Sequence, residues 1–234
     1  MDETDRRFWQ AARDTHVVRP PRQLLATFGS TVIRYYLVTE PSYAELDAQR
    51  AKDESVVREG TVKAERPQVV TPFYLMRHEG FGPDATRFLE ELVREHGPHS
   101  PGMLYTYRNE PMETSVVSGA PGEVAQRISE RLDREQRGLE AVIRGVDELW
   151  DVSLMKFIYE LTNNSLQANT EELHRKGLLE MEGKIPREAR QRIEWLLQQA
   201  RQGQVEPAEV HRELERWDLF DEYQDRFLEL FKKP

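Results

Sequence analysis

The stretch SVVSGAPGEVAQRISERL, residues 115–132, contains the change of pattern that decides the expected fold. Before Pro121 the chain consists of short apolar runs separated by prolines. After Pro121, apolar residues recur every four positions, at Val124, Ile128 and Leu132. This recurrence places them on one face of a helix. We therefore expect two domains, an α+β sheet domain over residues 1–121 and an α-helical, bundle-like region over residues 122–234.

The first half begins with a strand and a helix. Thr31–Thr39, TVIRYYLVT, is β-branched and aromatic, and apolar on both faces apart from Arg34. This composition predicts a central strand. Ser42 and Glu45 form an S-x-x-E capping box, so we expect a helix over residues 42–53.

The rest of the first half extends the sheet. Two strand-like runs, SVVRE and TVKAE, lie on either side of Gly60 and predict a hairpin in which the glycine supplies a positive φ. We expect another strand over residues 69–76, a helix over 83–96, and a second hairpin from 103–108 and 112–118. The order is β-α-β-β-α-β with one additional strand. It favours a ferredoxin-like domain, an antiparallel sheet with two helices on one face.

The second half is expected to be helical throughout. The apolar period continues over residues 139–150, and residues 152–161 (VSLMKFIYEL) are apolar nearly all round. Such a helix should be the most buried in the molecule and should join the two cores. We expect residues 162–165 to break it. Pro186 and Pro207 mark the starts of two further long helices.

Composition excludes several classes of protein. The 234 residues carry a net charge of −9 and no cysteine, which excludes disulfides, thiolate metal sites and cysteine nucleophiles. The acidic balance disfavours nucleic acid and anionic membranes as partners. No window is apolar enough to span a bilayer, and the first residues lack the apolar core of a secretion signal. We expect a cytoplasmic protein.

Residues 80–82, Gly-Phe-Gly, form with Ala85 a G-x-G-x-x-A pattern between an expected strand and a helix. A dinucleotide site needs free amides at such a helix start, but Pro83 lacks an amide hydrogen and Asp84 adds negative charge. The same residues could begin an RNA-binding strand, yet the sequence continues as proline and helix. We interpret them as an ordinary turn.

Metal ligands and catalytic motifs are not evident. His96 and His99 are a close pair in a proline-containing loop with no third ligand nearby, so we interpret them as a chance pair. The acidic last helix has interleaved arginines and predicts a solvated, salt-bridged face. A di-iron bundle requires Glu-x-x-His on two helices, and the pattern occurs once, at Glu171 and His174. We expect no catalytic residue, metal or cofactor.

Aromatic and basic side chains mark the place in the first half where we would look for a ligand: Tyr74, Arg77, His78, Tyr105 and Tyr107. The two late tyrosines share a face because strand side chains alternate. Such rows are either core packed against helices, the favoured interpretation, or an open aromatic face that binds a ligand.

The last helix carries a stripe of large aromatic side chains: Trp217, Phe220, Tyr223 and Phe227. Large aromatics dominate both cores and interfaces. The stripe therefore either closes the helical region on itself or docks on a protein partner or a second copy of the chain. The sequence leaves both alternatives open, with internal packing slightly favoured.

Two functions follow from these observations. The first is a non-enzymatic interaction or regulatory protein that acts through its helical half, as a homo-oligomer or with a protein partner. The alternative is a small-molecule binding protein or enzyme with a pocket between the sheet and the helices. A cleft there with convergent polar groups would support the second function, whereas a sheet face fully covered by its own helices would exclude it.

Overall fold

The computed structural model describes residues 3–45, 53–77 and 83–232. The chain forms two compact units, each built from two segments. Unit 1 comprises Met1–Arg66 and Tyr105–Thr170, and unit 2 comprises Pro67–Leu104 and Glu171–Pro234. The units are thus interleaved in sequence, whereas the change of pattern suggested a single division at residue 121. Helices and a mostly antiparallel sheet are both present, so the α+β class is confirmed.

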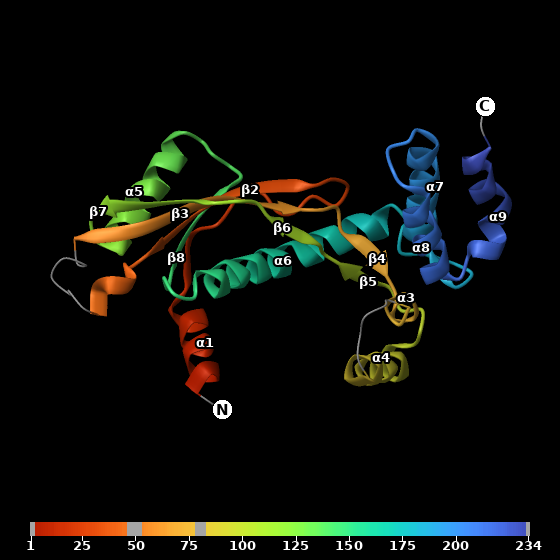
Figure 1. Cartoon of the computed structure of the whole chain (residues 1–234), viewed down its shortest axis with the longest axis horizontal. Helices are drawn as coiled ribbons and strands as arrows, with labels where there is room; N and C mark the ends of the chain where they lie inside the picture. Colours follow the sequence, from red (N-terminus) through yellow and green to blue (C-terminus); the bar gives the residue numbers. More distant parts are fainter. Residues whose placement is uncertain (1–2, 46–52, 78–82, 233–234) are drawn as a thin grey trace. The chain divides into compact units, whose positions relative to one another are not determined.

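Unit 1 contains one sheet and its helices (Figure 1). Its elements in chain order are α1 (Glu3–Asp14), β1 (His16–Arg19), β2 (Thr31–Thr39), the 3-10 helix η1 (Ser42–Glu45), β3 (Glu54–Ala64), β6 (Tyr107–Asn109), β7 (Glu113–Ser118), α5 (Pro121–Arg134), β8 (Glu140–Gly145) and α6 (Trp150–Arg175). The last turn of α6 continues into the sequence of unit 2.

The sheet of unit 1 has the order β1-β8-β2-β3, and β6 and β7 follow one another along the outer edge of β3. β2 and β8 are parallel neighbours, while β3 is antiparallel to both β2 and β7. It follows that β2, β7 and β8 run in the same direction. Their carboxyl ends, at Thr39, Ser118 and Gly145, therefore point to the same edge of the sheet.

The first two helices after Pro121, α5 and α6, cover opposite faces of this sheet (Figure 1). Alternate residues of β2 face each of them: Ile33, Tyr35 and Leu37 pack with α6, whereas Tyr36 and Val38 pack with α5. This alternation is the two-residue period of a strand. The ferredoxin-like arrangement, with both helices on one face, is not confirmed.

The structure corrects several expected elements of unit 1. Residues 54–64 form one continuous strand, not a hairpin, and Gly60 lies opposite Tyr35 within it. Residues 140–145, expected to be helical, form the buried strand β8 beside β2. The expected second hairpin is absent from the described residues, because β6 and β7 both pair with β3. Residues 162–165 do not break α6.

Unit 2 is mainly helical. Its elements are β4 (Gln68–Val70), α3 (Pro72–Leu75), α4 (Pro83–His96), β5 (Gly102–Leu104), β9 (Met181–Glu182), β10 (Ile185–Pro186), α7 (Arg187–Arg201), α8 (Pro207–Trp217), α9 (Phe220–Leu228) and the 3-10 helix η2 (Glu229–Phe231). The expected strand over 69–76 is a short strand followed by α3, which Thr71 caps by accepting a hydrogen bond from the Tyr74 amide. The expected last helix is divided at Asp218, whose φ is 59°.

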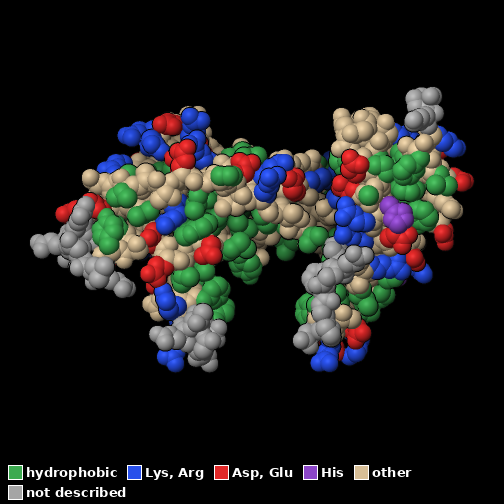
Figure 2. All heavy atoms as spheres, viewed as in Figure 1, with side chains coloured by type: hydrophobic (Ala, Val, Ile, Leu, Met, Phe, Trp, Pro, Cys, Tyr) green, Lys and Arg blue, Asp and Glu red, His purple; other side chains and the backbone are tan. Residues whose placement is uncertain are grey.

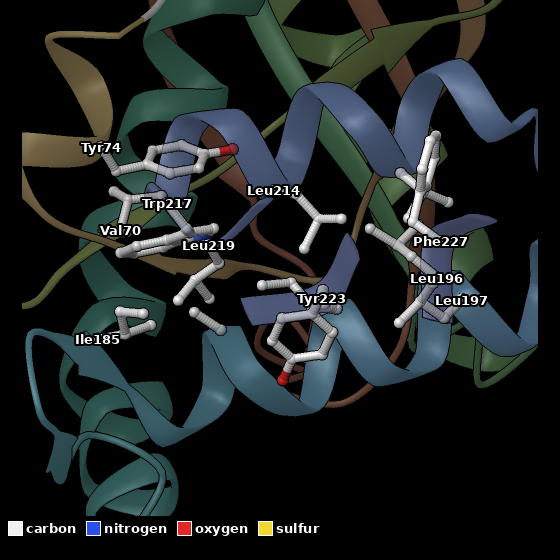
Figure 3. Close-up of a cluster of buried hydrophobic side chains, with 13 residues drawn as sticks. Val70, Tyr74, Ile185, Leu196, Leu197, Leu214, Trp217, Leu219, Tyr223 and Phe227 are labelled. Carbon is white, nitrogen blue, oxygen red and sulfur yellow. The ribbon is translucent and has the colours of Figure 1, made fainter. Parts of the chain in front are cut away.

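The core of unit 2 lies between α7, α8 and α9, with β4 and α3 completing it (Figure 3). It is built from aliphatic side chains on α7 and α8 and from the aromatic stripe at the end of the chain. In the part of the chain that the structure describes, no helix has the length and apolar character needed to cross a bilayer.

Candidate functional site

The aromatic stripe at the end of the chain lies inside unit 2. Trp217, Tyr223 and Phe227 are buried (Figure 3). Phe220 is half-buried, and its ring is centred 5.6 Å from that of Phe227. The sequence left open whether this stripe packs internally or docks on a partner, and in the structure these residues pack internally. They form a core and do not present an aromatic surface.

Tyr74 and Trp217 surround a buried carboxylate in unit 2. Their rings are centred 4.6 Å apart, and the Tyr74 hydroxyl and the Trp217 indole N–H donate to opposite oxygens of Glu213, at 2.9 and 3.2 Å. Arg192 Nε lies 3.4 Å from the same carboxylate. Burial, followed by the neighbouring Glu213, raises the pKa of Tyr74 to about 12. The arrangement satisfies a buried charge, so we interpret it as structural.

The other predicted ligand residues that the structure describes belong to different units. Tyr105 and Tyr107 of unit 1 pack under α6, where Tyr105 donates to Asn169 (3.3 Å) and the Tyr107 hydroxyl lies 2.5 Å from that of Thr162. Arg77 of unit 2 lies against Phe73 and donates to the Glu215 carbonyl at 2.9 Å. His78 and residues 80–82 lie outside the described residues. Tyr105 and Tyr107 therefore pack against the core, which is the favoured of the two interpretations of these residues.

A cavity of about 800 Å³ lies instead at the sheet edge of unit 1 where β2, β7 and β8 end. Residues that follow each of these strands line it, and α1 supplies the remaining wall. Its main lining residues are Arg6, Arg7, Gln10, Ala11, Asp14, Glu40, Pro41, Ser42, Ala120, Pro121, Gly122, Arg144, Gly145, Asp147, Glu148 and Leu149. Binding crevices in open sheets are commonly found beyond the carboxyl ends of parallel strands.

The wall between α1 and α6 is fixed by a pair of buried hydroxyl groups. Thr15 Oγ1 lies 2.7 Å from Ser153 Oγ, and Ser153 also accepts from the Val146 amide at 3.3 Å. A Cβ on Gly145 would lie 2.4 Å from Ser153 Oγ. Glycine at position 145 is therefore what allows α6 to pack so close to the end of β8.

A nearly buried ion pair holds the loop after β8 against the sheet. Asp147 Oδ1 accepts hydrogen bonds from Arg58 Nη1 at 2.6 Å and from Thr39 Oγ1 at 2.7 Å. The side chains of Arg58 and Asp147 are 13% and 14% exposed. The next residue, Glu148, instead forms an exposed ion pair with Arg7 of α1. Two of the acidic side chains on the cavity wall, Asp147 and Glu148, are therefore neutralised by arginines.

Three other charged groups on the wall have no partner among residues 3–45, 53–77 and 83–232. Arg144 lies on β8, is exposed, and forms no side-chain hydrogen bond or ion pair with the described residues. The same holds for Arg6 on α1 and for Glu40 after β2. Arg144 Nη1 lies 3.9 Å from the position that a Cβ on Gly122 would take. The first turn of α5 thus borders the Arg144 side of the cavity.

A second, smaller hollow of about 320 Å³ lies over Tyr36 on the α5 face. Its charges largely neutralise each other: Arg34 pairs with Glu59, Arg137 lies 3.8 Å from Glu140, and the Tyr36 hydroxyl donates to Glu140 at 3.0 Å. Burial, and then the Glu140 carboxylate, raise the pKa of Tyr36. We interpret this hollow as a surface ion-pair network.

Within the described parts of the chain, no cluster of three or more His, Asp or Glu side chains is placed to hold a metal ion. His96 lies 3.7 Å from the neighbouring Glu95, and the ring of His99 is centred 5.5 Å from that of Phe73. Comparisons with known proteins add no assignment: no family model, curated protein or solved structure matches the chain.

Sequence reasoning missed the residues of the cavity. Its lining comes from four separated segments that only the sheet topology brings together, so no local motif marks it. A weak signal does exist, because Pro-Ser follows β2 and Gly-Ala-Pro-Gly follows β7, and small residues and prolines are typical of the loops that border sites. A strand over residues 140–145 beside β2 would have placed the residues after both strands at the same edge of the sheet.

Proposed function

We propose that this chain is a small-molecule binding protein whose ligand occupies the cavity at the carboxyl ends of β2, β7 and β8. The main observation in favour of this function is the cavity itself, whose volume of about 800 Å³ falls in the range of ligand pockets. Its position at the edge where three strands of the same direction end supports the proposal. This is the alternative expected from the sequence, moved from the tyrosine face to the sheet edge.

The cavity wall supports binding more than catalysis. Among the described lining residues there are arginines, carboxylates and one serine hydroxyl, but no histidine that could act as a general base beside Ser42. The unpaired charges can orient a polar ligand, and the rigid strand ends hold them in place. We therefore propose a binding role, such as sensing or delivery of the ligand.

Filling the cavity tests this function. Gly122 is exposed in the first turn of α5, and among the described residues a Cβ there meets only Arg144 Nη1, in an ordinary contact. Gly122→Leu should therefore fold and fill the cavity. A panel of polar metabolites is screened by thermal shift against the wild type. A ligand at about 100 times its Kd should stabilise the protein by about 2.7 kcal/mol.

The matched control is Gln126→Leu, one turn further along α5 and outside the cavity lining. We expect ligand stabilisation in the wild type and in Gln126→Leu, and none in Gly122→Leu. Equal stabilisation of all three proteins would contradict the assignment of the cavity, as would a panel without a single binder.

A second candidate is self-association through α6. This helix leaves Met155, Tyr159 and Leu166 exposed on the face away from its sheet contacts, and Figure 2 shows hydrophobic side chains along it. An interaction through the helical half would therefore use the exposed face of α6, because the aromatic stripe proposed from the sequence is buried. A dimer in native mass spectrometry that Tyr159→Gln dissociates would support this role, and a monomeric wild type would argue against it.

A further inference from the structure

The unpaired charges of the cavity point to the class of ligand, an inference that rests on the proposed function. Of the three arginines on the wall, Arg7 is paired with Glu148, whereas Arg6 and Arg144 have no partner among the described residues. Of the acids, Asp147 is paired with Arg58, and Asp14 accepts a long hydrogen bond of 3.4 Å from Gln10. Two guanidinium groups, Arg6 and Arg144, and two carboxylates, Asp14 and Glu40, thus line the cavity without an ion-pair partner among the described residues.

Arg144 is the better placed of these two groups. It lies on β8, which pairs with β1 on one side and β2 on the other, and Arg144 itself is opposite both His16 and Val38. The sheet fixes the backbone from which the Arg144 side chain extends. A guanidinium donates up to five N–H groups in a planar fork that matches a phosphate or carboxylate.

The space beside Arg144 is kept open by the residues around it. Gly122 has no side chain to fill the gap to Arg144 Nη1, and Ala120, which precedes α5, has no side-chain oxygen to cap the helix. The first turn of α5 adds no anion site of its own, because Pro121 lacks an amide hydrogen and Glu123 adds negative charge. The two unpaired arginines therefore supply the cationic groups of the site.

We propose that the cavity binds a small phosphate monoester, with its phosphate on Arg144 and Arg6 and its remaining donors toward Glu40. A phosphate monoester carries nearly two negative charges at neutral pH, which matches the two guanidinium groups better than a single carboxylate does. Glu40 has no partner among the described residues, so it favours a ligand with hydroxyl or amine groups.

The test uses inorganic phosphate as the probe, titrated into the full chain by isothermal calorimetry at constant ionic strength. We expect saturable binding below about 10 mM and a loss of about tenfold or more in Arg144→Ala, because hydrogen bonds to a charged group carry that much affinity. The control is Arg134→Ala, an exposed arginine in the last turn of α5 that is not part of the cavity lining. It should bind phosphate within about twofold of the wild type.

Three results would overturn the inference: no phosphate binding by the wild type, equal losses in Arg144→Ala and Arg134→Ala, or acetate binding as tight as phosphate. The two proposals fail separately. If neutral metabolites stabilise the wild type but not Gly122→Leu while phosphate does not bind, the cavity is a ligand site and the phosphate assignment is wrong. If neither metabolites nor phosphate bind, the proposed function falls as well.

Discussion

A Cβ atom on Gly60 would lie 2.5 Å from the hydroxyl oxygen of Tyr35, its direct neighbour across the β2–β3 pair. Tyr35 is fully buried, and its hydroxyl donates to Asn109 Oδ1 at 3.1 Å. The ring thus crosses the space that any side chain at position 60 would take. Glycine at position 60 therefore leaves room for the Tyr35 ring against the neighbouring strand.

Gly60→Ala is therefore expected to destabilise unit 1. The added methyl group would collide with both the hydroxyl oxygen and the ring carbon that carries it, at 2.5 and 2.6 Å. Overpacking of this kind costs about 1–3 kcal/mol. The free energy of unfolding, measured by urea titration, should fall by that amount.

A double-mutant cycle assigns that loss to the ring. Tyr35→Leu removes the two clashing atoms, so Gly60→Ala should cost much less in the Tyr35→Leu background than in the wild type. The same cost in both backgrounds would show that position 60 requires glycine for another reason.

The loop that borders the cavity offers a comparison of two neighbouring acids. Asp147 is paired with Arg58 and 14% exposed, whereas Glu148 is paired with Arg7 and 56% exposed. We expect Asp147→Ala to lower the free energy of unfolding by about 2–4 kcal/mol, because it leaves the Arg58 charge buried without its partner. Glu148→Ala should change it by less than about 1 kcal/mol. Equal effects in urea titrations would refute this difference between the pairs.

Gln136, two residues after the end of α5, has φ of 55°, a conformation that favours glycine. Its side chain is exposed, so Gln136→Gly removes little packing. We expect a gain of about 0.5–1 kcal/mol in the free energy of unfolding. Gln126→Gly, in the middle of the same helix, should instead lose about 1 kcal/mol. A loss in both variants would contradict the left-handed assignment at position 136.

Local patterns predicted the helices better than the sheet. Residues 83–96 and those after Pro207 are amphipathic and form helices in the structure, because a face buried on one side leaves a clear period. β8 is buried on both faces, with Ala141, Val142 and Ile143 fully enclosed. Such a strand has no alternation, and its short apolar run is indistinguishable from helix by period alone.

Gly60 and Asp218 show a second limit of local reasoning. A glycine between two strand-like runs is typical of a hairpin, but here the reason for glycine is Tyr35, which is 25 residues away in the chain and becomes a neighbour only in the sheet. At Asp218 the chain turns through a left-handed conformation that aspartate tolerates, so the apolar period runs on across the break between α8 and α9.

The high pKa of Tyr74 predicts that alkaline pH weakens the core of unit 2. Burial, and then the neighbouring Glu213, raise its pKa from 10.0 to about 12, so the folded chain holds the phenolic proton more tightly than the unfolded chain does. The stabilisation is therefore complete below about pH 10 and is lost as the pH rises through about 12. A shift of this size corresponds to about 2–3 kcal/mol.

Urea titrations at about pH 9 and about pH 11.5 measure this loss as a fall in the free energy of unfolding. In Tyr74→Phe the fall should be smaller, because the group that titrates is gone while the ring still packs on Trp217. The pKa of Tyr105 is also raised to about 12 by burial, but this tyrosine is present in both proteins and cancels in the comparison. Tyr159→Phe, on the exposed face of α6, serves as the control and should keep the wild-type difference. An identical fall in the wild type and Tyr74→Phe would mean that the hydroxyl of Tyr74 does not hold its proton against Glu213 in the folded chain.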